Sequence, residues 1–223
     1  MNKNLLFTVV ASLSLLGCKS TEAEVSNAVV FSENFIQAYV VPHEIFLDAP
    51  SNTSCITIEF DGEWITNTLI SDKEKYESIS NKYGDKAYNN YLAPLTNVAL
   101  PEPITSINVV CDRNMNDEYP AGTSLNNIVK LYAVSPMRFI QNNYVQEESV
   151  AAPENLDKLL PSKYGYYSVS KFLNEVEEAD LTLLYNKCVL YFTQEIPQGE
   201  YELTITIDYQ GNKLSEKVRY IVK

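Results

Sequence analysis

Histidine and glycine are scarce in this 223-residue chain, which holds one His and seven Gly. Catalytic Ser-His pairs and most zinc sites draw on histidine, so a lone His43 beside Pro42 offers little for either chemistry. Basic residues are also few, with 17 Lys and Arg against 29 Asp and Glu and a formal net charge of −12. Such a chain lacks the basic patch that binds phosphate backbones or anionic lipid, and we expect no nucleic-acid partner.

The chain also lacks a long hydrophobic run. The N-terminal apolar segment from Leu5 to Leu16 covers only about twelve residues, whereas a helix that spans a bilayer needs roughly 20. Lys3 precedes this segment, and small residues follow it. A positive start, a short apolar middle and a small-residue exit are typical of a secretory signal peptide.

The segment ends on Leu15-Leu16-Gly17-Cys18, which resembles the lipobox of bacterial lipoproteins. The resemblance implies that residues 1–17 are removed as a signal peptide and that the Cys18 thiol becomes the lipid attachment site. Two or three acyl chains, of the palmitate kind, would anchor the protein stably in a membrane, because each buried methylene contributes about 0.8 kcal/mol. The alternative is an ordinary signal peptide that happens to contain a cysteine.

Residues 18–27 form the lipidated polar tether of this prediction, with no turn or core signal of their own. Some lipoproteins of Bacteroidota carry an acidic stretch after the cysteine that directs them to the cell surface, and Glu22 and Glu24 match it in part. The resemblance thus implies a location in the cell envelope, at the outer membrane. It leaves the choice between periplasmic and surface orientation open.

The remaining chain, 28–223, is long enough for one large domain. Its 45% hydrophobic content excludes a disordered chain. Sixteen Tyr and eight Phe favour strands, since an aromatic ring covers a half-buried pleated surface well.

Three cysteines remain beyond Cys18, which allows at most one disulfide. Cys111 and Cys188 each share a strand face with apolar neighbours, whereas Cys55 shares one with Thr57 and Glu59. If a disulfide exists, Cys111–Cys188 is the preferred pair, as a staple between two sheets. Three unpaired thiols are the alternative.

Period-two hydrophobicity dominates the first half of the chain. Strands are expected over 35–41 and 44–48, with Pro42 bending the chain or lying at a sheet edge. "CITIEF" and "EWITNTLI" follow, and the Asp61-Gly62 dipeptide between them predicts a two-residue hairpin turn. A further strand is expected over 104–110.

Two helical insertions are expected, near 71–92 and 153–176. In the first, Ser71 or Asp72 can cap the helix, apolar residues recur at spacings of three and four, and Gly84 can end it. In the second, "PENLDKLL" has Pro near a helix start, and "SKFLNEV" is read as a further helical turn. The segment 124–134 is ambiguous; strand is favoured for its second half, with "RFIQ" following Pro136.

The C-terminal segments "KCVLYFTQEI", "EYELTITIDY" and "EKVRYIV" alternate between apolar and polar residues and predict a three-stranded antiparallel meander. The stretch "IPQGEYELTITIDYQGN" resembles the closing hairpin of immunoglobulin-like sandwiches, over roughly 35 residues. The fold class expected is therefore mainly β, an antiparallel immunoglobulin-like β-sandwich with short helical insertions. In having both a lipobox and a predicted sandwich domain, the chain is similar to Bacteroidota lipoproteins of unassigned function.

One loop has oxygen-bearing side chains at alternate positions, as calcium loops do. Asp112, Asn114, Asn116 and Asp117 would be the ligands, but the sixth position lacks Gly and the twelfth lacks Glu. Calcium is thus a weak candidate cofactor, and a polar turn explains the same residues.

Exposed aromatic rings are the candidates for a binding surface. Trp64 follows Asp61-Gly62, and Tyr164, Tyr166 and Tyr167 lie in a segment that reads as a loop after Pro161. Core packing is the other fate of a lone Trp.

We expect a lipid-anchored extracytoplasmic protein that works by binding, either to a glycan or to a protein partner in an envelope assembly. One alternative is a carboxylate-dependent hydrolase of cell-surface polymers, which would need two facing carboxylates in a cleft, one with a raised pKa. The acidic run 175–180 invites that interpretation, although consecutive acids usually form a solvated face. The third hypothesis is a purely structural envelope lipoprotein. No catalytic residue is predicted.

Overall fold

The computed structural model describes residues 29–50, 54–93, 97–145 and 167–223. The expected signal peptide, Cys18, the tether, Tyr164, Tyr166 and the helix over 153–160 lie outside these residues. Strands make up 49% of the structure and helices 12%, which confirms the mainly β prediction. The elements in chain order are β1 Val30–Ser32, β2 Ala38–Asp48, β3 Cys55–Thr66, α1 Lys73–Tyr83, β4 Asn90–Leu92, β5 Val98–Ala99, β6 Ile104–Cys111, β7 Val129–Ser135, α2 Met137–Gln141, β8 Tyr167–Phe172, the 3₁₀ helix η1 Glu178–Leu181, β9 Lys187–Phe192, β10 Gly199–Tyr209 and β11 Asn212–Val222.

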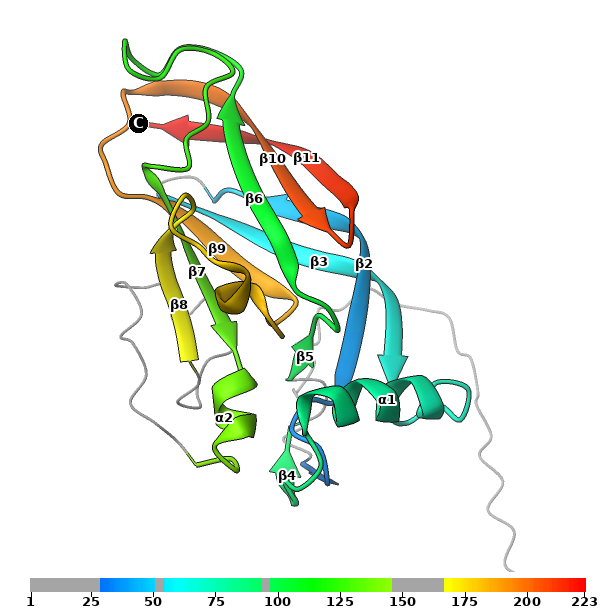
Figure 1. The fold of residues 1–223 in the computed structure, drawn as a ribbon. Helices are drawn as coiled ribbons and strands as arrows, with labels where there is room; N and C mark the ends of the chain where they lie inside the picture. The colour runs from blue at the N-terminus through cyan, green and yellow to red at the C-terminus, as the bar shows by residue number, and fades with distance from the viewer. Residues whose placement is uncertain (1–28, 51–53, 94–96, 146–166) are drawn as a thin grey trace, which may run out of the picture.

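Two sheets form the body and a short ribbon extends from it (Figure 1). The larger sheet has six strands in the order β5-β2-β3-β9-β7-β8, antiparallel except for the β5–β2 pair. The smaller sheet has three antiparallel strands in the order β11-β10-β6. The ribbon is the antiparallel pair β1–β4. Several antiparallel sheets are therefore present, as expected.

The main hydrophobic core contains buried residues from both the six-stranded and the three-stranded sheet. On β10, Tyr201, Leu203, Ile205 and Ile207 are all buried in this core. The intervening residues of the strand, such as Glu202, remain at least partly exposed. The predicted alternation of this strand is confirmed, because one face packs and the other meets water.

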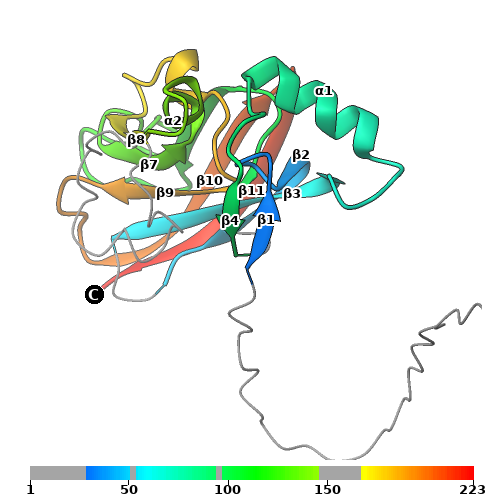
Figure 2. The same ribbon diagram turned by 90° about the horizontal axis from the view of Figure 1, so that it is seen from below.

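A second core lies on the opposite face of the six-stranded sheet. Val189 of β9 belongs to this core, whereas its neighbours Cys188 and Leu190 belong to the first one. Tyr76 and Tyr83 of α1 and Ile140 of α2 cover it. The six-stranded sheet is thus covered on both faces (Figure 2).

The predicted first helix is confirmed as α1. Asp72 occupies the N-cap position, although its carboxylate accepts a hydrogen bond from the Thr66 N–H (3.2 Å) rather than from the helix. The helix ends at Gly84, whose φ of 75° lies in the left-handed region that glycine adopts without strain. Helix does not continue to residue 92, because residues 90–92 form β4.

The Asp61-Gly62 hairpin prediction is wrong. β3 runs without interruption from Cys55 to Thr66 and pairs with β2, where Gly62 lies opposite Pro42. The ladder shifts register between Pro42 and Glu44, and a Cβ atom at Gly62 would lie 2.2 Å from the Val41 carbonyl oxygen. The glycine therefore permits a close backbone approach at a bulge, not a turn. Pro42 does not separate two strands as predicted but lies inside β2, at this register shift.

The predicted C-terminal meander is only partly correct. β10 and β11 form a hairpin through Gln210 and Gly211, both with positive φ (51° and 77°), as a tight two-residue turn requires. β9 does not join them but lies in the other sheet between β3 and β7. Its apolar sequence fits a strand with both faces covered better than an alternating edge strand.

The second predicted helical insertion is wrong where the structure describes it. Residues 167–172 form β8, which pairs with β7, so pairing with a neighbouring strand overrides the weak helical pattern of "SKFLNEV". The strand predicted for the second half of 124–134 is confirmed as β7. The residues after Pro136 form α2.

No disulfide links the cysteines in the described part of the chain. Cys55, Cys111 and Cys188 are free thiols and all are buried. The preferred Cys111–Cys188 pair is therefore wrong and the alternative of three unpaired thiols is confirmed. Burial raises the pKa of the Cys188 thiol to about 12, so it behaves as a small apolar side chain.

Candidate functional site

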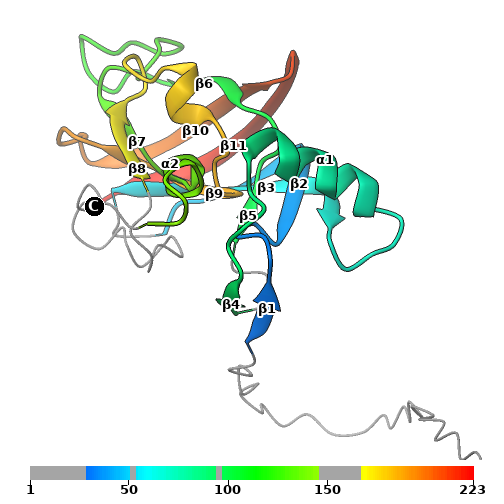
Figure 3. The same ribbon diagram turned by 60° about the horizontal axis from the view of Figure 1, so that its bottom comes forward.

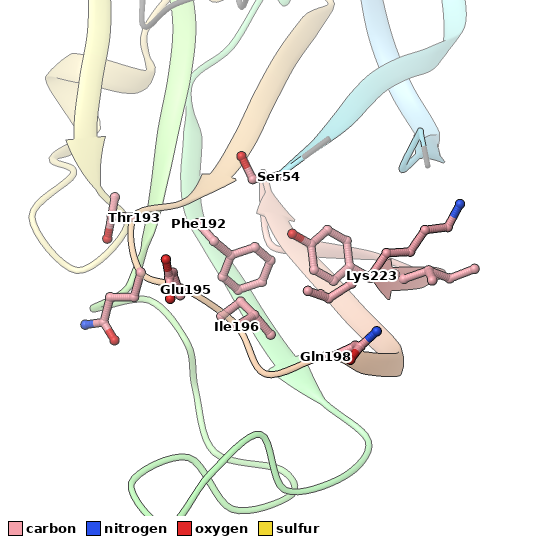
Figure 4. Close-up of a pocket in the computed structure, with 11 residues that line it drawn as sticks. Ser54, Phe192, Thr193, Glu195, Ile196, Gln198 and Lys223 are labelled. Carbon is pink, nitrogen blue, oxygen red and sulfur yellow. The ribbon is translucent and has the colours of Figure 1, made fainter. Parts of the chain in front are cut away.

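A pocket of about 680 Å³ opens where the chain crosses from β9 to β10, beside the end of β11 (Figure 4). Its volume lies within the range of small-ligand sites. We call it the crossover pocket. It is lined by Ser54, Phe192, Thr193, Gln194, Glu195, Ile196, Gln198, Tyr220, Ile221, Val222 and Lys223.

The apolar part of the crossover pocket is formed by Phe192, Tyr220 and Ile196. The rings of Phe192 and Tyr220 are buried in the main core, with their centroids 5.0 Å apart and their planes tilted by 41°. Figure 4 shows the Ile196 side chain next to the Phe192 ring. Burial raises the pKa of Tyr220 to about 12, so its hydroxyl stays protonated at neutral pH.

The rim of the crossover pocket is polar and mostly neutral. Ser54, Gln194 and Gln198 are exposed, and their amide and hydroxyl groups can both donate and accept hydrogen bonds. Glu195 and Lys223 add one charge of each sign. An apolar floor under neutral hydrogen-bonding groups suits an uncharged, hydroxyl-rich ligand.

A second pocket, of about 620 Å³, lies between α1 and the tip of the β10–β11 hairpin. Two carboxylates, Glu74 and Glu102, line it, and the Glu102 carboxylate is 2.6 Å from the Lys82 ammonium. Tyr209 also lines it, and its hydroxyl is the buried side-chain polar atom that finds no hydrogen bond within the described residues. The backbone N–H of Glu102 acts on that hydroxyl electrostatically without meeting hydrogen-bond geometry.

The hydrolase alternative requires a carboxyl group with a raised pKa in a cleft. Among the described residues Asp85 has a raised pKa, but it lines neither pocket. Burial raises the pKa of Asp85, and its oxygens accept hydrogen bonds from the Phe35 and Ile36 N–H groups (2.8 Å each) and from the Tyr144 hydroxyl (2.9 Å). These contacts connect the segments around residues 35, 85 and 144, so the Asp85 carboxyl stabilises the fold. The geometry therefore does not support the hydrolase alternative at this residue.

The acidic run that invited the hydrolase interpretation folds into η1. Asp180 is buried and accepts hydrogen bonds from the Lys171 ammonium (2.7 Å) and the Glu177 N–H (3.0 Å). Glu177 and Glu178 remain exposed. Glu177 and Asp180 form a capping box at the start of η1, and the other two acids of the run, Glu175 and Glu178, are exposed.

Trp64 is 41% exposed, so it lies at the surface rather than in the core. Its indole N–H donates to the Asp61 carboxylate at 2.9 Å. The structure does not bring it together with Tyr167, which lies in β8, three strands away from β3 in the sheet. Tyr167 is thus a strand residue that pairs with Ser135, not a loop residue as predicted.

The calcium-like loop behaves as a polar turn. The side-chain oxygens of Asp112, Asn114 and Asn116 accept hydrogen bonds from backbone N–H groups at 2.8 to 3.0 Å, and Asp117 is exposed. These oxygens therefore satisfy backbone donors of the loop and of β10. Within the described ranges, no cluster of three or more His, Cys, Asp or Glu side chains could hold a metal ion.

Several exposed apolar side chains that the sequence did not predict lie on the β1–β4 ribbon and in the loop between β3 and α1. Phe31 and Tyr91 are 56% and 62% exposed on the β1–β4 ribbon. Leu69 and Ile70 are 55% and 95% exposed in the loop between β3 and α1. The "EWITNTLI" pattern predicts a strand through Ile70, but β3 ends at Thr66 and Leu69 and Ile70 lie in the loop that follows.

Comparison of the chain with protein-family models, with curated proteins and with solved structures finds no match. Among the helices in the described part of the chain, none has the length and hydrophobicity to cross a membrane.

Proposed function

We propose that the protein is a lipid-anchored extracytoplasmic binding protein of the cell envelope, held at the outer membrane by acyl chains on Cys18. The anchor is supported by the Leu15–Cys18 motif and the short apolar segment before it. The observation that carries the binding function is the crossover pocket, with its aromatic and aliphatic floor and its neutral polar rim.

The pocket favours a glycan over other ligands. Sugars present hydroxyl groups, which pair with side-chain amides and hydroxyls, and apolar ring faces, which pack on aromatic rings. Gln194, Gln198 and Ser54 can supply the first kind of contact. The half-buried Ile196, which packs against the core that contains the Phe192 ring, can supply the apolar contact. A protein partner in an envelope assembly is the competing ligand class.

We also propose that the body is a variant of the immunoglobulin-like sandwich. Its support is the shared core between the two sheets and the crossing of the chain from β9 in one sheet to β10 in the other. The β5–β2 parallel pair and the β1–β4 ribbon would be additions to that plan.

Substitution Cys18→Ala tests the anchor. We expect the variant to leave the membrane fraction or to keep its signal peptide, and mass spectrometry of the wild-type protein to find acyl chains on Cys18. Ser20→Ala is the matched control and should leave processing unchanged. Normal processing and membrane retention of Cys18→Ala would contradict the anchor.

A glycan array probed with the detergent-solubilised full protein tests the binding site. The double variant Gln194→Ala/Gln198→Ala should weaken binding about tenfold or more, since each lost hydrogen bond is worth roughly 0.5–1.5 kcal/mol. Gln141→Ala, at an exposed glutamine of α2, is the control. Absence of glycan binding, or equal binding by the double variant, would contradict the proposal, and capture of a defined envelope protein would favour the competing ligand class.

A further inference from the structure

Exposed apolar side chains gather at the end of the molecule opposite the C-terminus. The β1–β4 ribbon carries Phe31 and Tyr91, and the loop between β3 and α1 carries Leu69 and Ile70. Figures 1 and 3 show the ribbon and this loop on either side of α1, far from the C-terminus. We call these four residues the apolar end.

The apolar end is formed by ordered contacts. The rings of Phe31 and Tyr91 lie directly opposite each other across the ribbon and pack edge to face, with centroids 5.6 Å apart. In the loop, the Asp72 N–H donates to the Leu69 carbonyl at 3.1 Å and the Asp72 carboxylate accepts from the Thr66 N–H. The fold therefore holds apolar groups in water at two places, which costs free energy unless another surface covers them.

The number of residues between Cys18 and the β1–β4 ribbon limits how far the ribbon can lie from the proposed lipid anchor. Val29, at the start of the ribbon, lies only eleven residues after Cys18. An extended chain spans at most about 3.6 Å per residue, so these residues lie within about 40 Å of each other. The crossover pocket lies at the other end of the molecule, beside the C-terminus (Figures 1 and 4).

The charge of this region is compatible with a lipid surface. Residues 69–92 contain four Lys and four acidic residues, in a chain whose overall net charge is −12. Lys75 and Lys82 pair with Glu63 and Glu102 from outside this stretch, so the excess negative charge that would repel anionic headgroups is small here but not zero. Aromatic rings and exposed aliphatic side chains favour the boundary between headgroups and acyl chains.

We propose that the apolar end docks onto the bilayer in which Cys18 is anchored, with Phe31, Tyr91, Leu69 and Ile70 inserted at the headgroup level. This inference rests on the proposed anchor. Docking fixes the orientation of the domain, so that the crossover pocket faces away from the membrane. The lipid chains hold the protein at the membrane, and the apolar end determines which side faces it.

The single tryptophan of the chain makes this proposal testable by fluorescence. Trp64→Phe provides a background without tryptophan, into which one reporter is placed by Ile70→Trp, Phe31→Trp or Phe46→Trp. Phe46 is the matched control, because it is 52% exposed but distant from the apolar end. It lies on β2, eight residues beyond Ala38, the first residue of that strand after the ribbon; at 3.3 Å per residue this is a distance of about 26 Å along the strand. All three positions are exposed, so these variants should retain the fold, as circular dichroism can verify.

The lipidated full-length variants are reconstituted into phosphatidylethanolamine and phosphatidylglycerol vesicles, with ordinary or brominated acyl chains. We expect the reporters at 70 and 31 to lose most of their emission with brominated lipid and to shift to the blue, while the reporter at 46 does neither. Equal emission of all three reporters in both kinds of vesicle, with the protein lipidated and floating with the vesicles, would overturn docking alone. An unmodified Cys18 and a protein that does not float would overturn the anchor and docking together.

Discussion

The face of the six-stranded sheet that meets β6, β10 and β11 is filled mostly by aliphatic side chains, whereas the opposite face has five tyrosines among its fifteen buried core residues. In the second core the Tyr83 hydroxyl donates to the Pro101 carbonyl (2.7 Å) and the Tyr185 hydroxyl to the Asn97 side chain (3.0 Å). Aliphatic packing is non-directional, while each buried hydroxyl needs a partner at a defined position. The first core has one such contact from Tyr201, whose hydroxyl donates to the Pro197 carbonyl (2.8 Å), but it depends mainly on the volume of its aliphatic side chains. The second core depends more on hydrogen-bond geometry.

The largest effect is expected at the buried acid of the second core. Asp85→Ala removes the carboxylate that accepts hydrogen bonds from the Phe35 and Ile36 N–H groups and from the Tyr144 hydroxyl. We expect a loss of about 4 kcal/mol in the free energy of unfolding, measured by urea denaturation. Asp85→Asn keeps one acceptor oxygen and should lose less; equal losses in the two variants would show that the hydrogen bonds are not the cause.

The same residue predicts a pH dependence. Since burial raises the pKa of Asp85 above its ordinary value of 3.8, the folded protein holds this proton more tightly than the unfolded chain. Its contribution to stability is then greatest below pH 3.8 and declines as the pH rises through the raised pKa. The stability of the wild-type protein relative to Asp85→Asn should fall over that range, and a relative stability that rises with pH would contradict this sign.

A truncation in the first core should cost less and show no such pH dependence. Ile205 is fully buried on β10, and Ile205→Ala leaves a cavity among aliphatic neighbours, for an expected loss of about 3 kcal/mol. Thr204→Ala, on the wet face of the same strand, should lose less than about 1 kcal/mol. Equal losses at the two positions would mean that burial on this strand does not decide its stability.

Elements that depend on their own sequence were predictable. β10 and β11 show the alternation and the turn residues that a hairpin needs, and α1 shows helical spacing and a terminal glycine. Asp61-Gly62 is as good a turn signal by composition, yet it lies inside a strand. The decisive fact is the partner strand, because the bulge at Pro42 brings the β2 backbone against Gly62.

The candidate site was less predictable than the fold. The crossover pocket combines Ser54 with residues around Phe192 and Lys223, which lie more than 130 residues away in the sequence. Each residue is unremarkable in its own segment, and only the placement of β9 and β10 in different sheets brings them together. Trp64 is exposed, although core packing is the commoner fate of a lone tryptophan, and it does not line this pocket.

The smallest effects compare one tyrosine hydroxyl from each core. Tyr185→Phe removes a hydrogen bond and leaves the buried Asn97 oxygen without that donor, so we expect a loss of about 1–2 kcal/mol. Tyr209→Phe removes a buried hydroxyl that has no hydrogen bond, so its free energy of unfolding should stay within about 0.5 kcal/mol of wild type or rise. Urea denaturation of both variants in one buffer measures the difference. A loss at Tyr209→Phe as large as that at Tyr185→Phe would mean that this hydroxyl has a partner, such as bound water in the pocket beside α1.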